Sequence, residues 1–142
     1  MNRYVKWFEA GEFPTPPIAK LLNMKLTSLK EGEAVFQIEV DERFANPMGT
    51  LHGGIIVSVA DSAMGMAYAS TLDDDESFTT LELKNNYLKP VWKGTLTATG
   101  KLIKRGKSIG IVECHVTDEE GSLVAFAVST CMTLSGEKAQ GR

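Results

Sequence analysis

A single carboxylate, Asp61, lies in a long apolar stretch of this 142-residue chain. Between Gly54 and Thr71 the sequence contains Asp61 and no Lys, Arg or His. Apolar residues fall on every side of a helical wheel, which predicts a buried helix over this stretch. A carboxylate in such a helix is costly unless another group pairs with it or it takes part in a reaction. Asp61 is therefore a candidate general base or nucleophile.

A second interpretation of Asp61 is structural. The hydroxyl of Ser58 or Ser62, close by on the same helix, could satisfy the carboxylate, and spacing alone leaves both interpretations open. A membrane-spanning role is excluded, because a spanning helix needs about 20 predominantly apolar residues. Here Asp61, two serines and two glycines interrupt a shorter run, so we expect no membrane partner.

The residues before the helix could stabilise an oxyanion. His52, Gly53 and Gly54 open the helix, where backbone N–H groups lack partners and the helix dipole favours negative charge. Because Gly53 has no side chain, a substrate can approach its backbone, whereas Gly54 is better explained by a tight turn. Acyl transfer needs this combination of an activated nucleophile and an oxyanion donor.

The composition indicates an ordinary globular domain. Apolar residues make up 43% of the chain and charged residues 23%, and the net charge of −3 argues against nucleic acid as a partner. The length fits one domain, residues 1–142. Cys114 and Cys131 lie in strand-like apolar context without metal-ligand spacing, so we expect core residues in a reducing compartment. The N-terminus has no signal-peptide pattern, which predicts a cytoplasmic protein.

The elements that must position Asp61 follow from periodicity. We expect a short helical segment over residues 1–23, a core over 24–134 and a frayed polar tail over 135–142. Two strands before the helix and four after it are predicted at Met24–Leu29, Ala34–Val40, Thr79–Leu88, Gly94–Lys104, Ser108–Thr117 and Ser122–Leu134. Hairpin-length separators predict that the last four are antiparallel neighbours in chain order. One sheet cannot cover a helix that is apolar on every side, which indicates a second copy of the chain.

Two motifs resemble a known family. Asn46-Pro-Met-Gly-Thr-Leu-His-Gly-Gly54 followed by Asp61-Ser-Ala-Met-Gly65 resembles the hotdog-fold acyl-CoA thioesterases, specifically the PaaI-type branch that acts on phenylacetyl-CoA-like thioesters. The resemblance covers roughly Met24 to Leu134, and Tyr87-Leu-Lys-Pro90 is similar to the third strand of that family. It implies an α+β hotdog fold, in which an antiparallel sheet wraps around a long central helix.

The resemblance also implies an assembly and an activity. Two subunits join their sheets, and dimers often pair into tetramers. The active sites lie at the dimer interface, with the carboxylate from one subunit and the Gly-rich loop from the other. The implied substrate is an acyl-CoA thioester, which is hydrolysed without a metal or redox cofactor, so that coenzyme A occurs only as part of substrate and product.

Individual catalytic roles follow from the match to the family. Asp61 would act as base or nucleophile, and the Gly53 N–H and the Asn46 amide would polarise the thioester carbonyl. Thr80, rather than Thr79, matches the hydroxyl that orients the attacking water. Asn before Pro is also a common loop residue, and either threonine could be an ordinary strand residue.

A further set of residues is expected to contact the substrate: His52, Gly54, Met48, Met64, Lys104, Arg105 and Lys107. The three basic residues lie at a predicted hairpin turn, which could bind the phosphates of coenzyme A or could simply be solvated. The methionines could line an adaptable acyl pocket or belong to the core. His52 is interpreted as a structural loop residue, since no cluster of ligands around it supports a metal site.

Two alternative functions remain open from the sequence. Some hotdog-fold dehydratases use a catalytic His with an acidic residue, so His52 also supports an acyl-thioester dehydratase or hydratase. A non-catalytic acyl-CoA-binding protein is a further alternative. The hotdog-fold regulators of that kind carry a DNA-binding module, for which the residues before Met24 leave little room.

Overall fold

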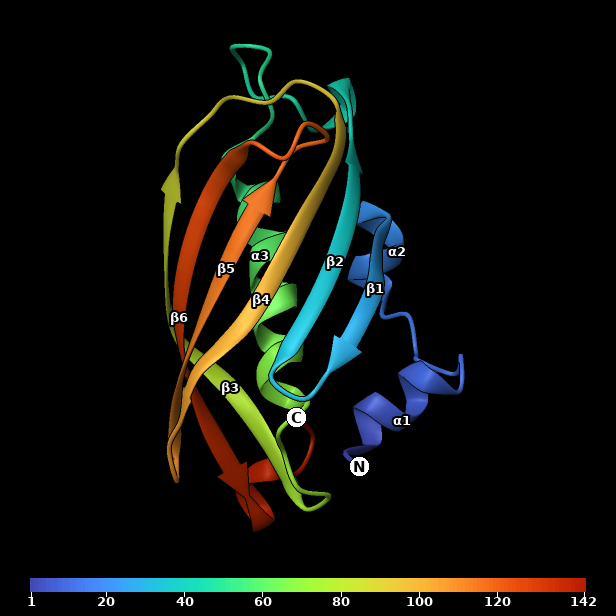
Figure 1. The fold of residues 1–142 in the computed structure, drawn as a ribbon, viewed down its shortest axis with the longest axis vertical. Coiled ribbons are helices and arrows are strands. Elements are labelled where there is room, and N and C mark those ends of the chain that lie inside the picture. The colour runs from blue at the N-terminus through green and yellow to red at the C-terminus, as the bar shows by residue number, and fades with distance from the viewer.

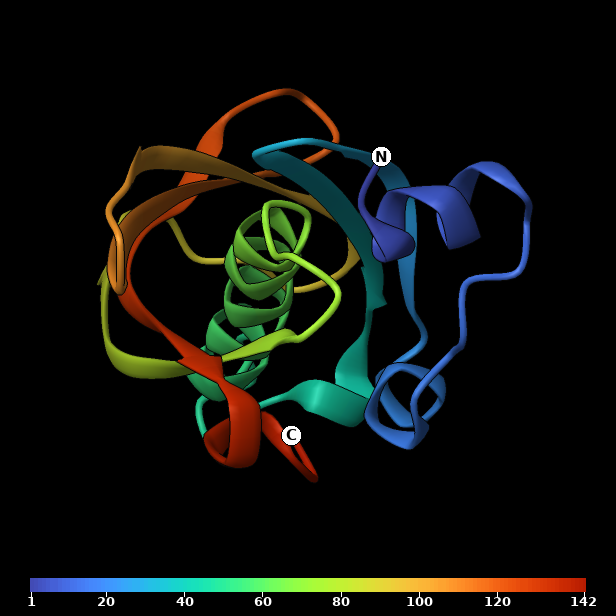
Figure 2. The same ribbon diagram turned by 90° about the horizontal axis from the view of Figure 1, so that it is seen from below.

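The structure, a computed structural model that describes all 142 residues, is a six-stranded antiparallel sheet curled around one long helix (Figure 1). The strands are β1 (Met24–Lys30), β2 (Glu33–Val40), β3 (Glu76–Tyr87), β4 (Gly94–Arg105), β5 (Ile109–Thr117) and β6 (Leu123–Ser135). The helices are α1 (Arg3–Glu9), α2 (Pro17–Leu22) and α3 (Gly53–Ala69), with short 3₁₀ helices at Glu42–Phe44 and Gly136–Ala139. The expected architecture, a sheet wrapped around a central helix, is confirmed, and Figure 2 shows α3 inside the curved sheet.

The strand order corrects one expectation. The sheet runs β1-β2-β4-β5-β6-β3, so β3 and β4 are not neighbours and β3 pairs only with β6. Three inter-strand spacings separate β3 from β4, about 14 Å, which six extended residues can span. The chain crosses there over one end of the sheet (Figure 1), held by hydrogen bonds from the N–H groups of Leu88 and Lys89 to the Val124 carbonyl oxygen. The prediction that β3 and β4 are hairpin neighbours was wrong because the segment that crosses between them is as short as a hairpin turn.

Helix α3 packs one side against the concave face of the sheet. Small residues allow a close approach: a Cβ atom on Gly100 of β4 would lie 2.5 Å from the Ala63 carbonyl oxygen. The residues of α3 that are buried by this packing are Ile56, Val59, Ala60, Ala63, Met64, Ala67, Tyr68 and Ala69. This face of the helix supplies the centre of the hydrophobic core.

The opposite face of α3 is not covered by its own chain. This uncovered stripe consists of exposed or half-exposed residues at helical spacing: Gly54, Ser58, Asp61, Ser62 and Gly65. A single sheet thus leaves one side of α3 open, as expected, and Asp61 lies on that side, next to the edge strand β3.

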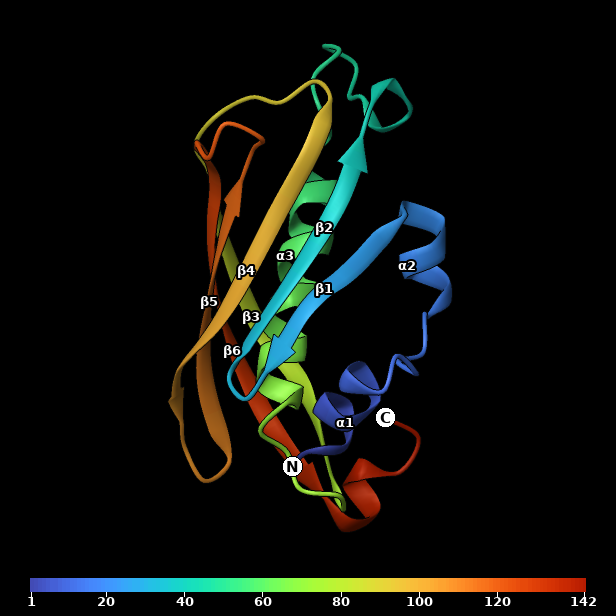
Figure 3. The ribbon, with the colours of Figure 1, turned by 45° about the vertical axis from the view of Figure 1, so that its right-hand side comes forward.

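The N-terminal segment lies outside β1, beside the uncovered side of the core (Figure 3). Pro17 begins α2 and Asn23, in the left-handed conformation, ends it. Asn2 attaches α1 to the end of α3, because its side-chain amide donates hydrogen bonds to the carbonyl oxygens of Ala69, at 2.9 Å, and Leu72, at 2.7 Å. The helical segment expected over residues 1–23 is present as two short helices, which contribute to one wall of a pocket described below.

Two smaller expectations concern the core and the membrane. Cys114 and Cys131 are free thiols buried in the core, as predicted. None of the helices combines the length and the apolar character that crossing a bilayer requires.

Candidate active site

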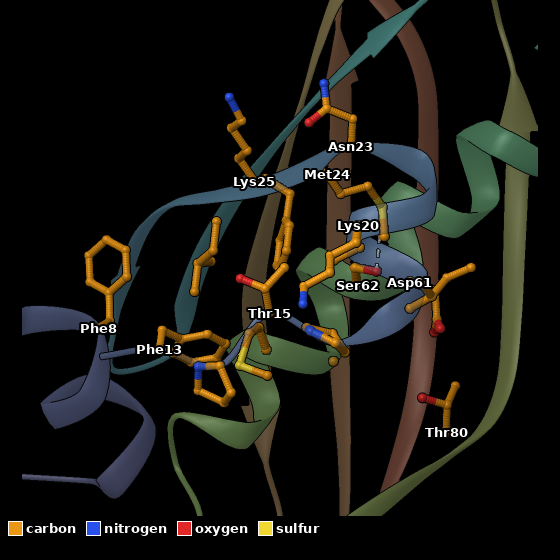
Figure 4. Close-up of a pocket in the computed structure, with 18 of the residues that line it drawn as sticks. Phe8, Phe13, Thr15, Lys20, Asn23, Met24, Lys25, Asp61, Ser62 and Thr80 are labelled. Carbon is orange, nitrogen blue, oxygen red and sulfur yellow. Dashed lines mark hydrogen bonds between the residues drawn. The ribbon is translucent and has the colours of Figure 1, made fainter. Parts of the chain in front are cut away.

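Asp61 and Thr80 face the same pocket. It has a volume of about 800 Å³ and lies between α3, β1, β3 and the N-terminal segment (Figure 4). Phe78 and Thr80 both line it, and alternate strand residues share a face, so Thr79 points to the other side of the sheet. The Thr80 hydroxyl has one neighbour within polar contact, the Cys131 Sγ at 3.9 Å. The structure therefore places Thr80, rather than Thr79, in the same pocket as Asp61.

The Asp61 carboxylate has no hydrogen-bond or ion-pair partner. The Ser58 hydroxyl donates to the Gly54 carbonyl oxygen and the Ser62 hydroxyl to the Ser58 carbonyl oxygen, each at 2.9 Å. The hydroxyls that a structural Asp would use are thus bound to the helix backbone. Although the side chain is partly exposed in the single chain, desolvation by its surroundings raises the pKa of Asp61. A free carboxylate with a raised pKa is suited to accepting a proton.

The first turn of α3 leaves one backbone donor free. The Nδ1 atom of His52 accepts a hydrogen bond from the Gly54 N–H at 2.9 Å, so His52 is the N-cap of the helix. The Gly53 N–H donates to no acceptor in the structure. Of the two glycines, Gly53 therefore offers the donor at the positive end of the helix dipole, and Gly54 is occupied.

Tyr87 is a neighbour of Gly53 that the sequence did not assign to the site. Its hydroxyl donates to the Gly53 carbonyl oxygen at 3.1 Å, and a Cβ atom on residue 53 would lie 2.9 Å from the ring. A side chain at this position would therefore require the exposed end of Tyr87 to move. The motif Tyr87–Pro90 was visible in the sequence, but only the fold places it over the helix start.

Asn46 organises the loop that precedes α3. Its Nδ2 donates to the Thr50 Oγ1 at 2.7 Å, and its Oδ1 accepts from the Met48 N–H at 2.9 Å. Gly49 completes this turn with a φ of +92°, a conformation that favours glycine. One hydrogen of the Asn46 amide is thus committed to the loop, and the other remains available for a ligand.

The two methionines of the predicted acyl pocket lie in different surroundings. Met48 is 83% exposed on the loop, whereas Met64 is fully buried on the sheet side of α3 and does not line the pocket. The expectation for Met64 is therefore wrong, because its helical position faces the sheet. Met66, two residues further, does line the pocket.

The basic turn between β4 and β5 contains two free cations rather than three. The Arg105 guanidinium lies 3.6 Å from the Glu76 carboxylate, donates to the Thr71 Oγ1 at 3.1 Å and stacks over the Tyr68 ring at 5.0 Å. It holds the hairpin to the end of α3. Lys104 and Lys107 are exposed and form no ion pair, so these two could meet an anionic ligand.

The proposed donor and the carboxylate are far apart within one chain. Gly53 precedes Asp61 by eight positions on α3, which corresponds to about 12 Å along the helix axis. A reacting carbonyl must lie about 3 Å from both the nucleophile and the oxyanion donors. One chain therefore holds both halves of an acyl-transfer site without bringing them to the same substrate atom.

Comparison with known proteins follows this geometry. The family model of the thioesterase superfamily matches residues 48–125. The chain is 34% identical to the 1,4-dihydroxy-2-naphthoyl-CoA hydrolase of Listeria monocytogenes, over 80% of this chain and 92% of that one. It is 32% identical to the acyl-coenzyme A thioesterase PaaI of Escherichia coli, over 76% of each chain. The structure of the E. coli PaaI protein superimposes with a TM-score of 0.85 over 95% of this chain and 96% of that one, at 24% identity.

Proposed function

The chain belongs to the thioesterase superfamily, as a hotdog-fold protein of the PaaI type and a thioester hydrolase, and from this premise we propose that it hydrolyses acyl-CoA thioesters to a free acid and coenzyme A. One observation supports the proposal above all: the Asp61 carboxylate is unpaired, has a raised pKa and faces a pocket beside Thr80. Curated relatives that are named as acyl-CoA hydrolases support the choice of thioester.

In the proposed reaction, water attacks the thioester carbonyl carbon while Asp61 takes its proton. Thr80 orients that water, and the Gly53 N–H with the free hydrogen of the Asn46 amide stabilises the oxyanion. The carbon–sulfur bond then breaks, and the leaving thiolate takes up the proton from Asp61. Direct attack by Asp61, with water cleaving the resulting anhydride, would use the same groups.

We further propose that two chains complete each site. Because Gly53 and Asp61 lie about 12 Å apart on one helix, the uncovered stripe of α3 must face a second copy that supplies the missing half. The open edge of β3 offers backbone groups through which the two sheets can join. Asp61 and Thr80 of one subunit then act with Gly53 and Asn46 of its partner.

Release of free thiol tests the proposed function. We expect the protein to release coenzyme A from short, long and aromatic acyl-CoA thioesters at rates that differ with the acyl group, detected with a thiol reagent. Hydration of an enoyl-CoA without thiol release would instead support the dehydratase or hydratase alternative. Saturable binding of acyl-CoA without turnover would support the non-catalytic alternative.

The basic turn provides a second prediction. Replacing Lys104 and Lys107 together with Gln should raise KM for an acyl-CoA by about five-fold and leave kcat nearly unchanged, because the lost contacts are solvent-exposed ion pairs with phosphate. The same acyl group on N-acetylcysteamine, which lacks the nucleotide, should be hydrolysed equally by both proteins. Arg105 is left in place because it holds the hairpin, and Lys6→Gln on α1 is the charge-matched control. Equal losses on both thioesters would exclude this role.

A further inference from the structure

The pocket at Asp61 is built largely from chain that lies outside the matched family region. Its walls include residues 8–26, whereas the family model begins at residue 48. Apolar side chains from five elements and the loop before α2 line it: Phe8, Phe13, Leu26, Phe36, Met66 and Phe78. A volume of about 800 Å³ is in the range of small-molecule sites. Given the proposed function, this pocket would receive the acyl group, with the thioester at Asp61.

Lys20 is the cation that enters this pocket. In Figure 4 its side chain runs from α2 toward Thr15, whereas Lys25, the other lysine of the lining, points away from the pocket. Lys20 takes part in none of the five ion pairs of the structure and in no side-chain hydrogen bond. Its ammonium group is therefore a free donor beside apolar walls.

Lys20 and Asp61 lie apart in the lining: in Figure 4 the Lys20 ammonium group points toward Thr15, whereas Asp61 lies on the side of Thr80. They form no ion pair, and the pKa of Asp61 is raised by desolvation with no contribution from a neighbouring cation. The pocket thus presents an unpaired carboxylate on the side of Thr80 and an unpaired ammonium group on the side of Thr15. A ligand with one anionic end is repelled by Asp61 and attracted by Lys20, which fixes its orientation.

We propose that Lys20 binds a carboxylate at the far end of the acyl group, so that the preferred substrates are thioesters of dicarboxylic acids with an aromatic or alicyclic body. The apolar walls receive the ring, and Lys20 pairs with the second carboxylate in a charge-assisted hydrogen bond. When the acyl group lacks this carboxylate, the Lys20 ammonium group stays solvated by water and contributes nothing to binding. Lys20 is thereby a specificity-determining residue supplied by the N-terminal segment.

Two matched thioesters test this inference, 4-carboxyphenylacetyl-CoA and 4-methylphenylacetyl-CoA. The wild-type protein should prefer the carboxylate by about five-fold in kcat/KM, as expected for a partly exposed ion pair. Lys20→Met should abolish this preference by lowering turnover of the carboxylate alone, and Lys20→Glu should reverse it. Lys25→Met is the matched control and should keep the wild-type ratio. Because Lys20 is exposed, all variants should keep the wild-type Tm.

The outcomes separate this inference from the proposed function. If wild type and Lys20→Met show the same ratio of kcat/KM between the two thioesters, Lys20 does not recognise the acyl group. Thiol release would still support the proposed hydrolase. If the wild type releases thiol neither from this pair nor from short or long acyl-CoA thioesters, the proposed function fails. Kd values for the same pair, measured by calorimetry, then decide the role of Lys20. If Lys20→Met leaves the ratio of the two Kd values unchanged, Lys20 does not bind the second carboxylate and this inference is overturned.

Discussion

Replacing Asp61 with Asn should lower kcat by about 10²–10⁴-fold, because Asn keeps the shape of the side chain but cannot accept a proton or attack a carbonyl. KM should change little, since the pocket walls and Lys20 remain. The measurement is steady-state thiol release on the best acyl-CoA. Ser62→Ala is the matched control: Ser62 also lines the pocket, but its hydroxyl is bound to the helix backbone, so this variant should stay near the wild-type rate.

The stability of the Asn variant distinguishes a catalytic Asp61 from a structural one. Desolvation raises the pKa of Asp61, so folding favours the protonated carboxyl. That contribution to stability is complete below the pKa of the unfolded chain and is lost as pH rises through the higher pKa of the folded chain. At neutral pH the Asn variant should therefore melt at the same temperature as wild type or slightly above it. A lower Tm with retained activity would show that Asp61 has a structural role.

The pH dependence of activity also tests the catalytic role of Asp61. Activity requires the ionised carboxylate, so kcat/KM should fall on the acid side as Asp61 is protonated. Because the pKa is raised, this fall should begin at a higher pH than the ordinary value of 3.8 would give. This fall in kcat/KM at acid pH should be absent from the residual activity of the Asn variant.

Mixing two inactive variants should restore activity. Gly53→Ala adds a methyl group beside the free Gly53 N–H, where the thioester carbonyl must approach, and a loss of about 10²-fold is expected because the carbonyl is kept from this donor. When Gly53→Ala and Asp61→Asn chains are mixed and allowed to exchange, each heterodimer has one site free of both substitutions. Since half of the dimers are mixed and half of their sites are intact, activity should recover to about a quarter of wild type.

A second mixture controls for this recovery. Asp61 and Thr80 lie in the same half-site, so mixing Asp61→Asn with Thr80→Val leaves every site impaired and should give no recovery. Sedimentation velocity should show dimers or larger assemblies in all samples at micromolar concentration. Mixed dimers of Asp61→Asn and Gly53→Ala without recovered activity would contradict the shared site, and a stable, active monomer would exclude it altogether.

Local sequence patterns predicted the elements but not all of their partners. The period of the apolar residues located α3 and the six strands to within a few residues, because backbone propensity and side-chain alternation act locally. The position of β3 beside β6 was missed, since a crossing of hairpin length looks like a turn. The exposure of Asp61 was missed because the stretch was interpreted as apolar on every side. Its small and polar residues in fact follow helical spacing and mark the side that the sheet leaves open: Gly54, Ser58, Asp61, Ser62 and Gly65.

The residues of the candidate site divide in the same way, into those that the sequence predicted and those that depend on long-range packing. Asp61, Gly53 and Thr80 were found from residue types, spacing and resemblance, and the fold gives each a free group or a place in the pocket. Arg105 was counted as a free cation, but Glu76 and Tyr68 bind it from distant parts of the chain. The contact of Tyr87 with Gly53 and the entry of Lys20 into the pocket also depend on long-range packing, which no local pattern encodes.

The pairing of β3 with β6 alone has a consequence for biosynthesis. Helix α3 and β3 leave the ribosome well before β6, which is the last strand of the chain and the only one that pairs with β3. At about 5–20 residues per second, the nascent chain spends several seconds with β3 unpaired. Closure of the core must then wait for the final segment of the polypeptide. Premature termination at the start of β6 would leave β3 without its only partner and one edge of β5 open, so the product would be a substrate for chaperones and proteases rather than a slightly shortened enzyme.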